Sequence, residues 1–365
     1  MDFTPTEAQT DLAALTREIL TDQLSGQRLH KLEAGSDRFD AELWSSLADA
    51  GVLAAALPES VGGSGYGPLE RCSVLVEVGR AVAPVPYLWS VAAAGAALAQ
   101  FGDVSVQRRW ATPVASGQLV ATAALTEAPG GVVAATPDGE GWSLSGSVGV
   151  VPSGPVAGLI LVAASTPDGR RVFLVTPEDG GVRVHRQRTV DLDSAGLVEL
   201  TGVKLTADRL LGGAAAADVP GWLINHATLG LCAVTLGVVE RALELTAEYA
   251  RTRIQFGRPI GAFQAVSQRL AEAYLDVEAI RLTLWQAAWR LATGQPADTE
   301  LATAKFWAAD GGHRVAHTAV HVHGGVGIDV DHPVHRYFVA AKRCEFTLGG
   351  ATEQLVQLGA LLAAK

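Results

Sequence analysis

The sequence has few cysteines and no excess of positive charge. Only three cysteines, Cys72, Cys232 and Cys344, occur among 365 residues, and none has the spacing of a metal or redox motif. We therefore expect reduced thiols, as in a cytoplasmic protein. Lysine and arginine number 28 against 38 acidic residues, a net charge of -10, and no basic block stands out. This composition argues against a nucleic-acid-binding surface.

Long hydrophobic runs are missing as well. The longest, such as residues 53–57 and 91–98, are too short to span a bilayer. The first residues, Met-Asp-Phe-Thr, lack the basic and apolar regions of a secretory signal. We therefore expect a soluble cytoplasmic protein that does not enter a membrane. A hydrophobic content of 48% supports a large core, and 365 residues predict two or three cooperating domains.

The predicted secondary structure divides the chain into three successive regions. Residues 1–115 are predicted to be helical, beginning with a capping box in Thr4-Pro5-Thr6-Glu7 that has proline at the first helical position. Residues 116–212 read as short strands separated by turns such as Pro137-Asp-Gly139, which indicates an antiparallel barrel or sandwich. Residues 213–365 are predicted to form a helical domain. Its expected helices cover about 229–249, 263–291, 299–322 and 334–346, with a terminal one after Gly350.

The first long helix of the last domain has two distinct faces. Gly230 and Gly237 lie on one face and permit the close approach of another helix. Glu240, Glu244 and Glu248 recur every four residues on another face, which predicts a solvated stripe.

The segment Arg253-Ile-Gln-Phe-Gly-Arg-Pro-Ile-Gly-Ala-Phe-Gln264 separates the first two long helices. Its glycines and proline break one helix and allow the next to start, so it forms an elbow. Arg253 and Phe256 remain near this elbow as a fixed cation and a flat apolar ring. Such a pair suits a ligand that has both a phosphate and an aromatic system.

This elbow and a second motif, His321-Val-His-Gly-Gly-Val-Gly327, resemble two motifs of the acyl-CoA dehydrogenases. In that family the elbow arginine reaches the pyrophosphate of an FAD held mainly by a neighbouring subunit. The likeness covers essentially the whole chain. It implies an α+β multidomain fold with an N-terminal helical domain, a middle antiparallel β-barrel or sandwich and a C-terminal four-helix bundle. It also implies FAD, an acyl-CoA substrate and an electron-transferring flavoprotein as acceptor.

The residues that perform the family's reaction are missing. That reaction is the α,β-desaturation of an acyl thioester, in which a carboxylate removes the α-proton while the β-hydrogen leaves as hydride. The resemblance places the base at Gly349 or at Ala227, and neither residue can accept a proton. Glu345 and Glu353 are near in sequence but are expected to point to different faces. No catalytic residue is therefore assigned to this chain.

The flavin contacts that a subunit makes with its own cofactor are also eroded. Thr126-Glu-Ala-Pro-Gly-Gly-Val-Val133 lacks the family's Ser-Asp pair, and Val150-Val-Pro-Ser153 stands where the family has Trp-Ile-Thr-Asn. The retained residues are those that extend into a neighbour's flavin site, with histidine in place of glutamine at position 321: Arg253, Gln255, Phe256, Gln264, His321, Gly324 and Gly325. This pattern indicates a non-catalytic subunit that completes the FAD site of a catalytic chain.

The runs Thr246 to Arg253 and Asp331-His-Pro-Val-His-Arg336 are similar to those of one subgroup. These are the smaller subunits of actinobacterial heteromeric acyl-CoA dehydrogenases that act on steroid side-chain CoA thioesters. The likeness implies an α2β2 heterotetramer with two flavins, and small residues at both base positions would leave room for a bulky acyl group. Two alternatives remain open: a self-sufficient homomeric dehydrogenase or oxidase with a non-standard base, and a flavin-free structural dimer.

Histidines recur every four residues at His313, His317 and His321, a spacing that could bind zinc. No carboxylate partner like that of a His-Glu-x-x-His motif accompanies them, and His321 already has a place in the second motif. No metal site is predicted.

Overall fold

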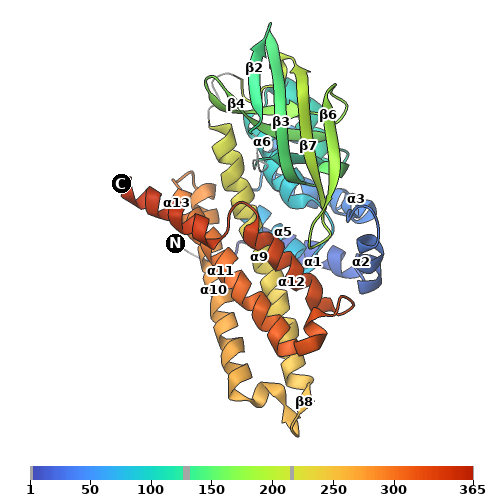
Figure 1. The fold of residues 1–365 in the computed structure, drawn as a ribbon, viewed down its shortest axis with the longest axis vertical. Coiled ribbons are helices and arrows are strands. Elements are labelled where there is room, and N and C mark those ends of the chain that lie inside the picture. The colour runs from blue at the N-terminus through green and yellow to red at the C-terminus, as the bar shows by residue number, and fades with distance from the viewer. Residues whose placement is uncertain (1–2, 126–131, 214–217, 365) are drawn as a thin grey trace. The chain divides into compact units, whose positions relative to one another are not determined.

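The computed structural model describes residues 3–125, 132–213 and 218–364 (Figure 1). Backbone contacts group the chain into two compact units. The first, which we call the helical unit, combines Met1–Gly26, Pro68–Ala83 and Thr228–Lys365, and the second, the sheet unit, combines Gln27–Gly67 and Pro84–Ala227. N-terminal helices are thus part of the same unit as the C-terminal ones. The predicted boundaries 1–115, 116–212 and 213–365 remain predictions.

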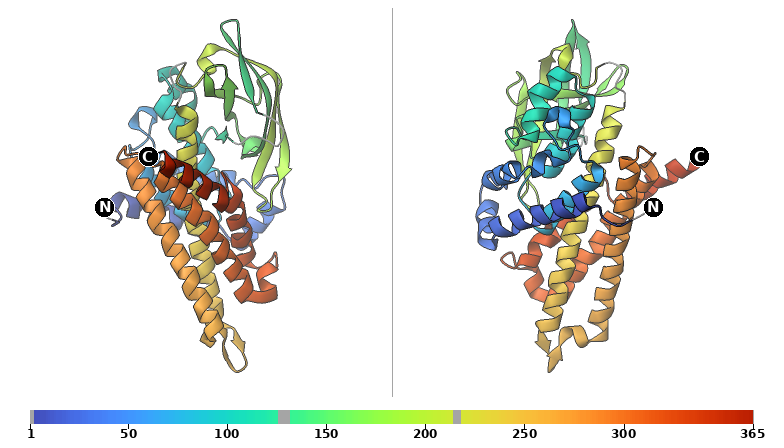
Figure 2. Two further views of the ribbon diagram at one scale, coloured as in Figure 1. Left: turned by 60° about the vertical axis from the view of Figure 1, so that its left-hand side comes forward. Right: turned by 180° about the vertical axis from the view of Figure 1, so that it is seen from behind.

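The helical unit is built from long helices. Those of residues 219–363 have bounds that agree with the predicted ones within a few residues, apart from the earlier start of α9. In this unit α11 packs against α10, α12 and α13 (Figures 1 and 2). Its helices are α1 (Glu7–Gln23), α5 (Pro68–Arg80), most of α9 (Val219–Thr252), α10 (Gln264–Ala292), α11 (Asp298–His323), α12 (Pro333–Phe346) and α13 (Ala351–Ala363).

The structure contains a capping box at the start of α1, but it begins two residues later than predicted. Thr6 is the N-cap, its side chain accepts from the Gln9 amide at 3.2 Å, and the Gln9 side chain accepts from the Thr6 amide at 2.9 Å. Pro5 therefore precedes the helix. The sequence offers two threonines, each followed three residues later by an acidic or amide side chain, and the structure uses the second.

Close packing of α5 against α9 confirms the role predicted for Gly237. A Cβ atom placed on Gly237 would lie 1.9 Å from the carbonyl oxygen of Val76. A Cβ on Gly79 of α5 would lie 2.2 Å from the carbonyl oxygen of Val234. Each glycine therefore admits the backbone of the other helix, and no larger residue fits at either position.

The predicted solvated stripe on α9 is wrong for its first member. The Glu240 side chain is only 10% exposed and forms ion pairs with Arg80, at 3.1 Å, and with Arg281. Glu244 pairs with Arg80 at 2.8 Å, whereas Glu248 is 61% exposed. Arginines from α5 and α10 cover the stripe, and a spacing rule within one helix cannot reveal cations supplied by other helices.

By length and composition, α9 could cross a membrane, since its most apolar window has a mean hydropathy of 1.6. Uninterrupted apolar runs alone do not reveal this helix, because polar residues are scattered along it. Within the protein, 78% of that window is buried. A helix that is apolar on most faces and covered by its own chain has the pattern of a core helix.

The sheet unit contains one sheet of seven strands with the order β1-β4-β2-β3-β7-β6, and β5 also pairs with β4. Its core includes Leu144, Phe173 and Val198, all fully buried. The strands are β1 (Ala121–Ala124), β2 (Ala134–Asp138), β3 (Gly141–Pro152), β4 (Leu159–Thr166), β5 (Gly169–Val175), β6 (Val182–Arg188) and β7 (Ser194–Leu205).

The sheet is mixed, whereas the sequence predicted antiparallel strands. Four described pairs, including β3 with β7, are antiparallel, but β4 runs parallel to β1 and to β2. Parallel neighbours need a long crossover. The hairpin of β2 and β3 supplies that crossover between β1 and β4, which local turn signals do not show.

Shorter helices accompany the sheet in this unit. They are α2 (Gly26–Glu33), α3 (Ala41–Asp49), α4 (Val52–Ala55), a π-helical segment at Tyr87–Gly95, α6 (Ala96–Phe101), α7 (Val104–Val106) and α8 (Thr112–Ala115).

Candidate functional site

The predicted elbow is a short β-hairpin at the tip of the long helices, where β8 is labelled in Figure 1. Strand β8 (Ile254–Gln255) pairs antiparallel with β9 (Arg258–Pro259). The two residues between them, Phe256 and Gly257, both have left-handed backbones, with φ of 50° and 77°. Positive φ at both central residues is what a two-residue type I′ turn requires.

Phe256 occupies a costly position at the tip of this hairpin. Its side chain is 92% exposed, and a bulky residue at positive φ is a backbone outlier. Within the chain its ring makes an edge contact with Phe263, with centroids 6.1 Å apart. The fold gains little from a strained and exposed aromatic residue, so its use is expected to lie outside this chain.

Arg253 is exposed at the base of the hairpin. Its amide donates to the carbonyl of Tyr249 at 2.8 Å, and its carbonyl accepts from Ile260 at 2.9 Å. In residues 3–125, 132–213 and 218–364, no carboxylate forms an ion pair with its guanidinium, whereas Arg251 pairs with Glu248. The backbone of Arg253 is thus fixed while its charge is available.

Two glutamines flank this cation. Gln255 lies in β8, where its side-chain amide donates to the Ile254 carbonyl at 2.8 Å. Gln264 is the first residue of α10 and is exposed. The elbow therefore presents two amides, the exposed ring of Phe256 and two cations, Arg253 and Arg258, of which Arg258 lies over the ring of Phe263 at 4.2 Å. Residues 253–264 contain no acidic side chain.

The second predicted motif forms the end of α11 and a short 3-10 helix, Gly324–Ile328. Gly324 has φ of 65°, and a Cβ on Gly327 would lie 2.8 Å from the Val320 carbonyl oxygen. Both glycines are thus explained by the fold. Gly325 has open space around it and an ordinary φ, so its missing side chain is not required internally. His321 is exposed on the last turn of α11.

The structure brings the two motifs to one end of the helical unit. The ring of Tyr249, four residues before Arg253, stacks on His323, which directly precedes Gly324. The centroids are 4.3 Å apart and the planes differ by 23°. This contact was not predicted, because no spacing rule relates two residues that are far apart in sequence.

Neither predicted base position offers a proton acceptor. Ala227 is fully buried. Gly349 has φ of 93°, its neighbour Leu348 has φ of 57°, and a Cβ on Gly349 would lie 2.9 Å from the side-chain nitrogen of Gln354. That nitrogen donates to the Leu348 carbonyl at 3.1 Å and holds the turn. A residue with a side chain at position 349 would therefore be strained.

The two nearby carboxylates lie in different surroundings. Glu345 pairs with Lys342 at 2.5 Å and with His313 at 3.1 Å, and it is 13% exposed. Glu353 is exposed in the first turn of α13. The Glu345 carboxylate is thus engaged within α11 and α12.

The histidines of α11 do not converge on one centre. The rings of His313 and His317 lie 4.2 Å apart, and burial, followed by the charges of His313 and Lys342, lowers the pKa of His317. His321 is exposed further along the helix. Across residues 3–125, 132–213 and 218–364, no group of three metal-binding side chains is found.

The segment expected beside a subunit's own flavin, Val150 to Ser153, has a strained backbone and is hydrogen-bonded to residues of β6 and β7. Val150 and Ser153 have φ of 54° and 55°. The Gln187 side chain accepts from the Val150 amide at 2.6 Å, and the Ser194 carbonyl accepts from the Ser153 amide at 2.6 Å. The other eroded segment, 126–133, lies mostly outside the described residues.

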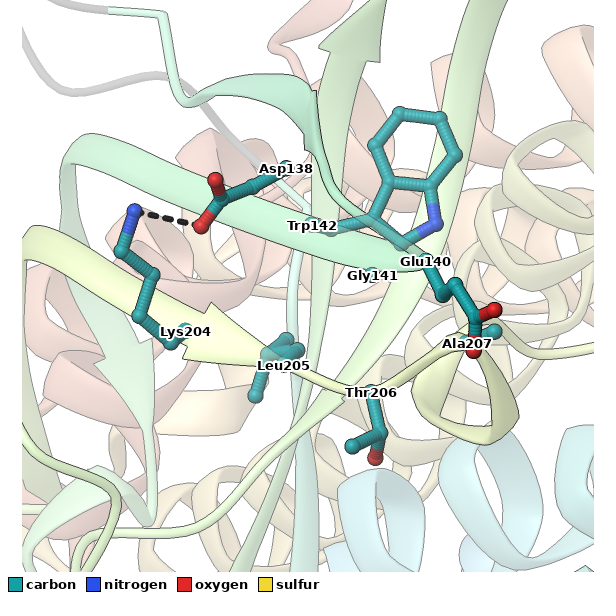
Figure 3. A pocket seen from close by; sticks show the side chains of 8 residues that line it. All are labelled: Asp138, Glu140, Gly141, Trp142, Lys204, Leu205, Thr206 and Ala207. Carbon is teal, nitrogen blue, oxygen red and sulfur yellow. Dashed lines mark ion pairs between the residues drawn. The ribbon is translucent and has the colours of Figure 1, made fainter.

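A pocket of about 330 Å³ lies at the end of the sheet and contains none of the predicted site residues (Figure 3). It is formed by β2, β3 and the end of β7, with Trp142 on one side. Its charged pair, Lys204 and Asp138, is joined at 2.6 Å, so these groups satisfy each other. The lining also includes the carboxylate of Glu140 and the hydroxyl of Thr206.

Comparison with protein families gives two matches in this chain. Residues 6–118 match the model described as acyl-CoA dehydrogenase, N-terminal domain. Residues 217–361 match the model described as acyl-CoA dehydrogenase, C-terminal domain.

Individual proteins match over the full length. The chain is 52% identical to acyl-CoA dehydrogenase FadE27 of Mycobacterium tuberculosis, over 100% of this chain and 99% of the relative. It is similar to a chain in the crystal structure of the ChsE4-ChsE5 complex from Mycobacterium tuberculosis, with a TM-score of 0.97, 52% identity and 100% of both chains covered. A chain of a variant of the Tcur3481-Tcur3483 steroid ACAD matches with a TM-score of 0.92 and 43% identity, over 98% of each chain.

Proposed function

This chain belongs to the acyl-CoA dehydrogenase family of oxidoreductases that act on CH–CH bonds, and from that premise we propose that it is the non-catalytic subunit of a heteromeric FAD-dependent enzyme. One observation carries the proposal. Both base positions lack a carboxylate, at buried Ala227 and at left-handed Gly349, whereas the hairpin with Arg253 and Phe256 is ordered and exposed.

The exposed residues of the helical unit fit the parts of FAD. The guanidinium of Arg253, which has no ion pair within the described part of the chain, would hold the pyrophosphate, since arginine binds phosphate through several parallel hydrogen bonds. The bare ring of Phe256 would pack against a ring system of the cofactor.

The remaining predicted residues would supply donors and a close backbone. Gln255, Gln264 and His321 would donate hydrogen bonds. At Gly324 and Gly325, backbone without side chains would approach the cofactor. The chemistry that bound FAD supplies in this family is acceptance of the β-hydride of the acyl thioester, so these residues bind and orient without moving a proton.

A homologous catalytic chain is the proposed partner, in an α2β2 heterotetramer with FAD shared at the interface. The similarity to a chain of the ChsE4-ChsE5 complex supports a heteromer, and the steroid ACAD supports a bulky, steroid side-chain acyl-CoA as substrate. Small residues at the base positions would leave volume for that group. We further propose a cytoplasmic location and an electron-transferring flavoprotein as acceptor.

Separate and joint expression tests this proposal. The purified chain alone is expected to be colourless and inactive, whereas co-expression with a homologous chain that carries a glutamate at either base position should give a yellow, active complex. A yellow chain that desaturates an acyl thioester unaided would establish the homomeric alternative. A colourless, inactive complex would favour the flavin-free structural role.

The contribution of the hairpin is tested within the complex. Arg253→Ala should weaken FAD binding at least tenfold, as expected for loss of a charge-assisted pair to phosphate. Arg251→Ala is the matched control, because this exposed arginine lies in the same chain segment and pairs with Glu248. Equal FAD affinity in the Arg253→Ala complex and the parent complex would contradict the proposed contact.

A further inference from the structure

A column of three aromatic rings crosses the end of the helical unit behind the hairpin. Tyr249 of α9 stacks on His323 of α11, and His323 lies 5.2 Å from the ring of His332. His332 is the N-cap of α12. The column therefore joins the last turn of α9, the last turn of α11 and the start of α12. His323, its central ring, is only 4% exposed.

Hydrogen bonds fix the orientation of both histidines. The Nδ1 atom of His323 lies 2.8 Å from the carbonyl oxygen of Ala319, and because a carbonyl only accepts, Nδ1 carries the proton. The Nδ1 atom of His332 accepts from the Val334 amide at 3.3 Å and so carries none. Burial, partly offset by the Ala319 bond and reinforced by His332, lowers the pKa of His323. A neutral ring with one defined tautomer is thus held between its neighbours.

Two of the three rings, Tyr249 at one end of the column and His323 at its centre, are each one covalent or hydrogen-bonded step from a proposed flavin-site residue. The Tyr249 carbonyl accepts from the amide of Arg253 at 2.8 Å, which is the last main-chain turn before the hairpin. His323 is followed immediately by Gly324, whose φ of 65° starts the glycine turn. Movement between Tyr249 and His323 would therefore shift Arg253 relative to Gly324.

On the basis of the proposed function, we propose that His323 is a positioning residue for FAD at the shared site. Its stack on Tyr249 sets the distance between the Arg253 hairpin and the Gly324–Gly325 turn. The ring itself makes no contact with cofactor in this assignment, since it is buried behind both motifs. A histidine that merely filled the core would stabilise the chain without acting through Arg253.

The experiment uses the complex with the homologous catalytic chain and measures the dissociation constant of FAD. His323→Ala removes the stack and should weaken FAD binding about tenfold, the order expected for loss of a well-packed aromatic pair. His323→Phe retains a ring and should restore binding to within about twofold of the parent. Tyr249→Phe keeps the ring of the other partner and should likewise bind FAD to within about twofold of the parent. Arg251→Ala again serves as the control, because this exposed arginine lies outside the stack and pairs with Glu248.

A double-mutant cycle separates positioning from packing. If His323 acts through Arg253, adding His323→Ala to Arg253→Ala should weaken FAD binding little further, because coupled residues are not additive. Independent, multiplying effects of the two changes would overturn the inference. His323→Leu keeps the apolar volume and covers the case in which the alanine variant does not assemble. It should bind FAD about as weakly as predicted for alanine, and parent-like binding would also overturn the inference.

The outcomes for this inference and for the proposed function are distinct. If Arg253→Ala leaves FAD affinity unchanged, the proposed flavin contact fails and His323 loses its role with it. If Arg253→Ala weakens binding while His323→Ala does not, the shared site stands and only the positioning role is wrong.

Discussion

At the scale of single residues, Phe256 in the hairpin contributes little to the stability of the fold but is proposed to contribute to flavin binding. Phe256 is 92% exposed at φ of 50°. Its side chain contributes little buried surface, and its backbone is in a region that glycine adopts more readily. Stability and flavin binding should therefore respond in opposite directions to one substitution.

Phe256→Gly is expected to leave the free energy of unfolding unchanged or raise it by up to about 1 kcal/mol, because positive φ no longer strains a side chain. The same change should weaken FAD binding by the complex, since the exposed ring is lost. Urea unfolding of the chain and FAD titration of the complex measure the two effects. A large loss of stability would show that the ring is needed for folding.

The turn before α13 gives a second prediction at this scale. Gly349→Glu should not produce an active homomer, and it should destabilise the chain by about 1–2 kcal/mol, because a non-glycine residue at φ of 93° is strained. Gly359→Glu is the control, since Gly359 has open space around it in α13 and gains helix propensity. Desaturase activity in Gly349→Glu alone would show that the missing carboxylate, and not the strained turn or the eroded flavin contacts, is what keeps the single chain inactive.

At the scale of elements, the approach of α5 to α9 depends on two glycines. Gly237→Ala should destabilise the chain by about 1–3 kcal/mol, because the new methyl group meets the Val76 carbonyl and the helices must separate. Gly221→Ala, in open space on the same helix, should be nearly neutral. Thermal or urea unfolding distinguishes the two. Equal stability of both variants would mean that α5 moves without cost.

Local sequence patterns predicted the bounds of the helices well, but they did not predict which side chains of other helices contact them. Helix bounds in residues 253–365 follow from apolar periodicity and from Gly and Pro at the ends, so the predicted and observed bounds nearly coincide. The burial of Glu240 depends on Arg80 and Arg281, which other helices supply. The hairpin had only half of the usual sequence signal, since glycine at position 257 suits the second residue of a type I′ turn, whereas phenylalanine at position 256 is unusual at positive φ.

The site was predicted through resemblance more than through physics. Arg253 and Phe256 were identified by their motif, and the structure adds that one is unpaired within the described residues and the other bare. The stacking of Tyr249 on His323 could not be predicted from residue spacing or composition. Tertiary contacts between distant residues of this kind emerge only once the fold is known.

At the scale of the whole molecule, the proposed site is incomplete in one chain, so ligand and partner should stabilise together. Adding FAD should raise the melting temperature of the complex and leave that of the isolated chain unchanged, because only a state that binds the ligand gains stability from it. Thermal scans at several FAD concentrations provide the measurement. A shift in the isolated chain would reveal a complete flavin site within it.

The left-handed pair Leu348 and Gly349 has a consequence for how this chain can change over time. A carboxylate at position 349 would need a left-handed backbone, and its Cβ atom would meet the Gln354 side-chain nitrogen that holds the turn, so this loop disfavours it. If the chain works beside a catalytic partner as proposed, the geometry of this turn opposes a self-sufficient enzyme arising by a single substitution at position 349.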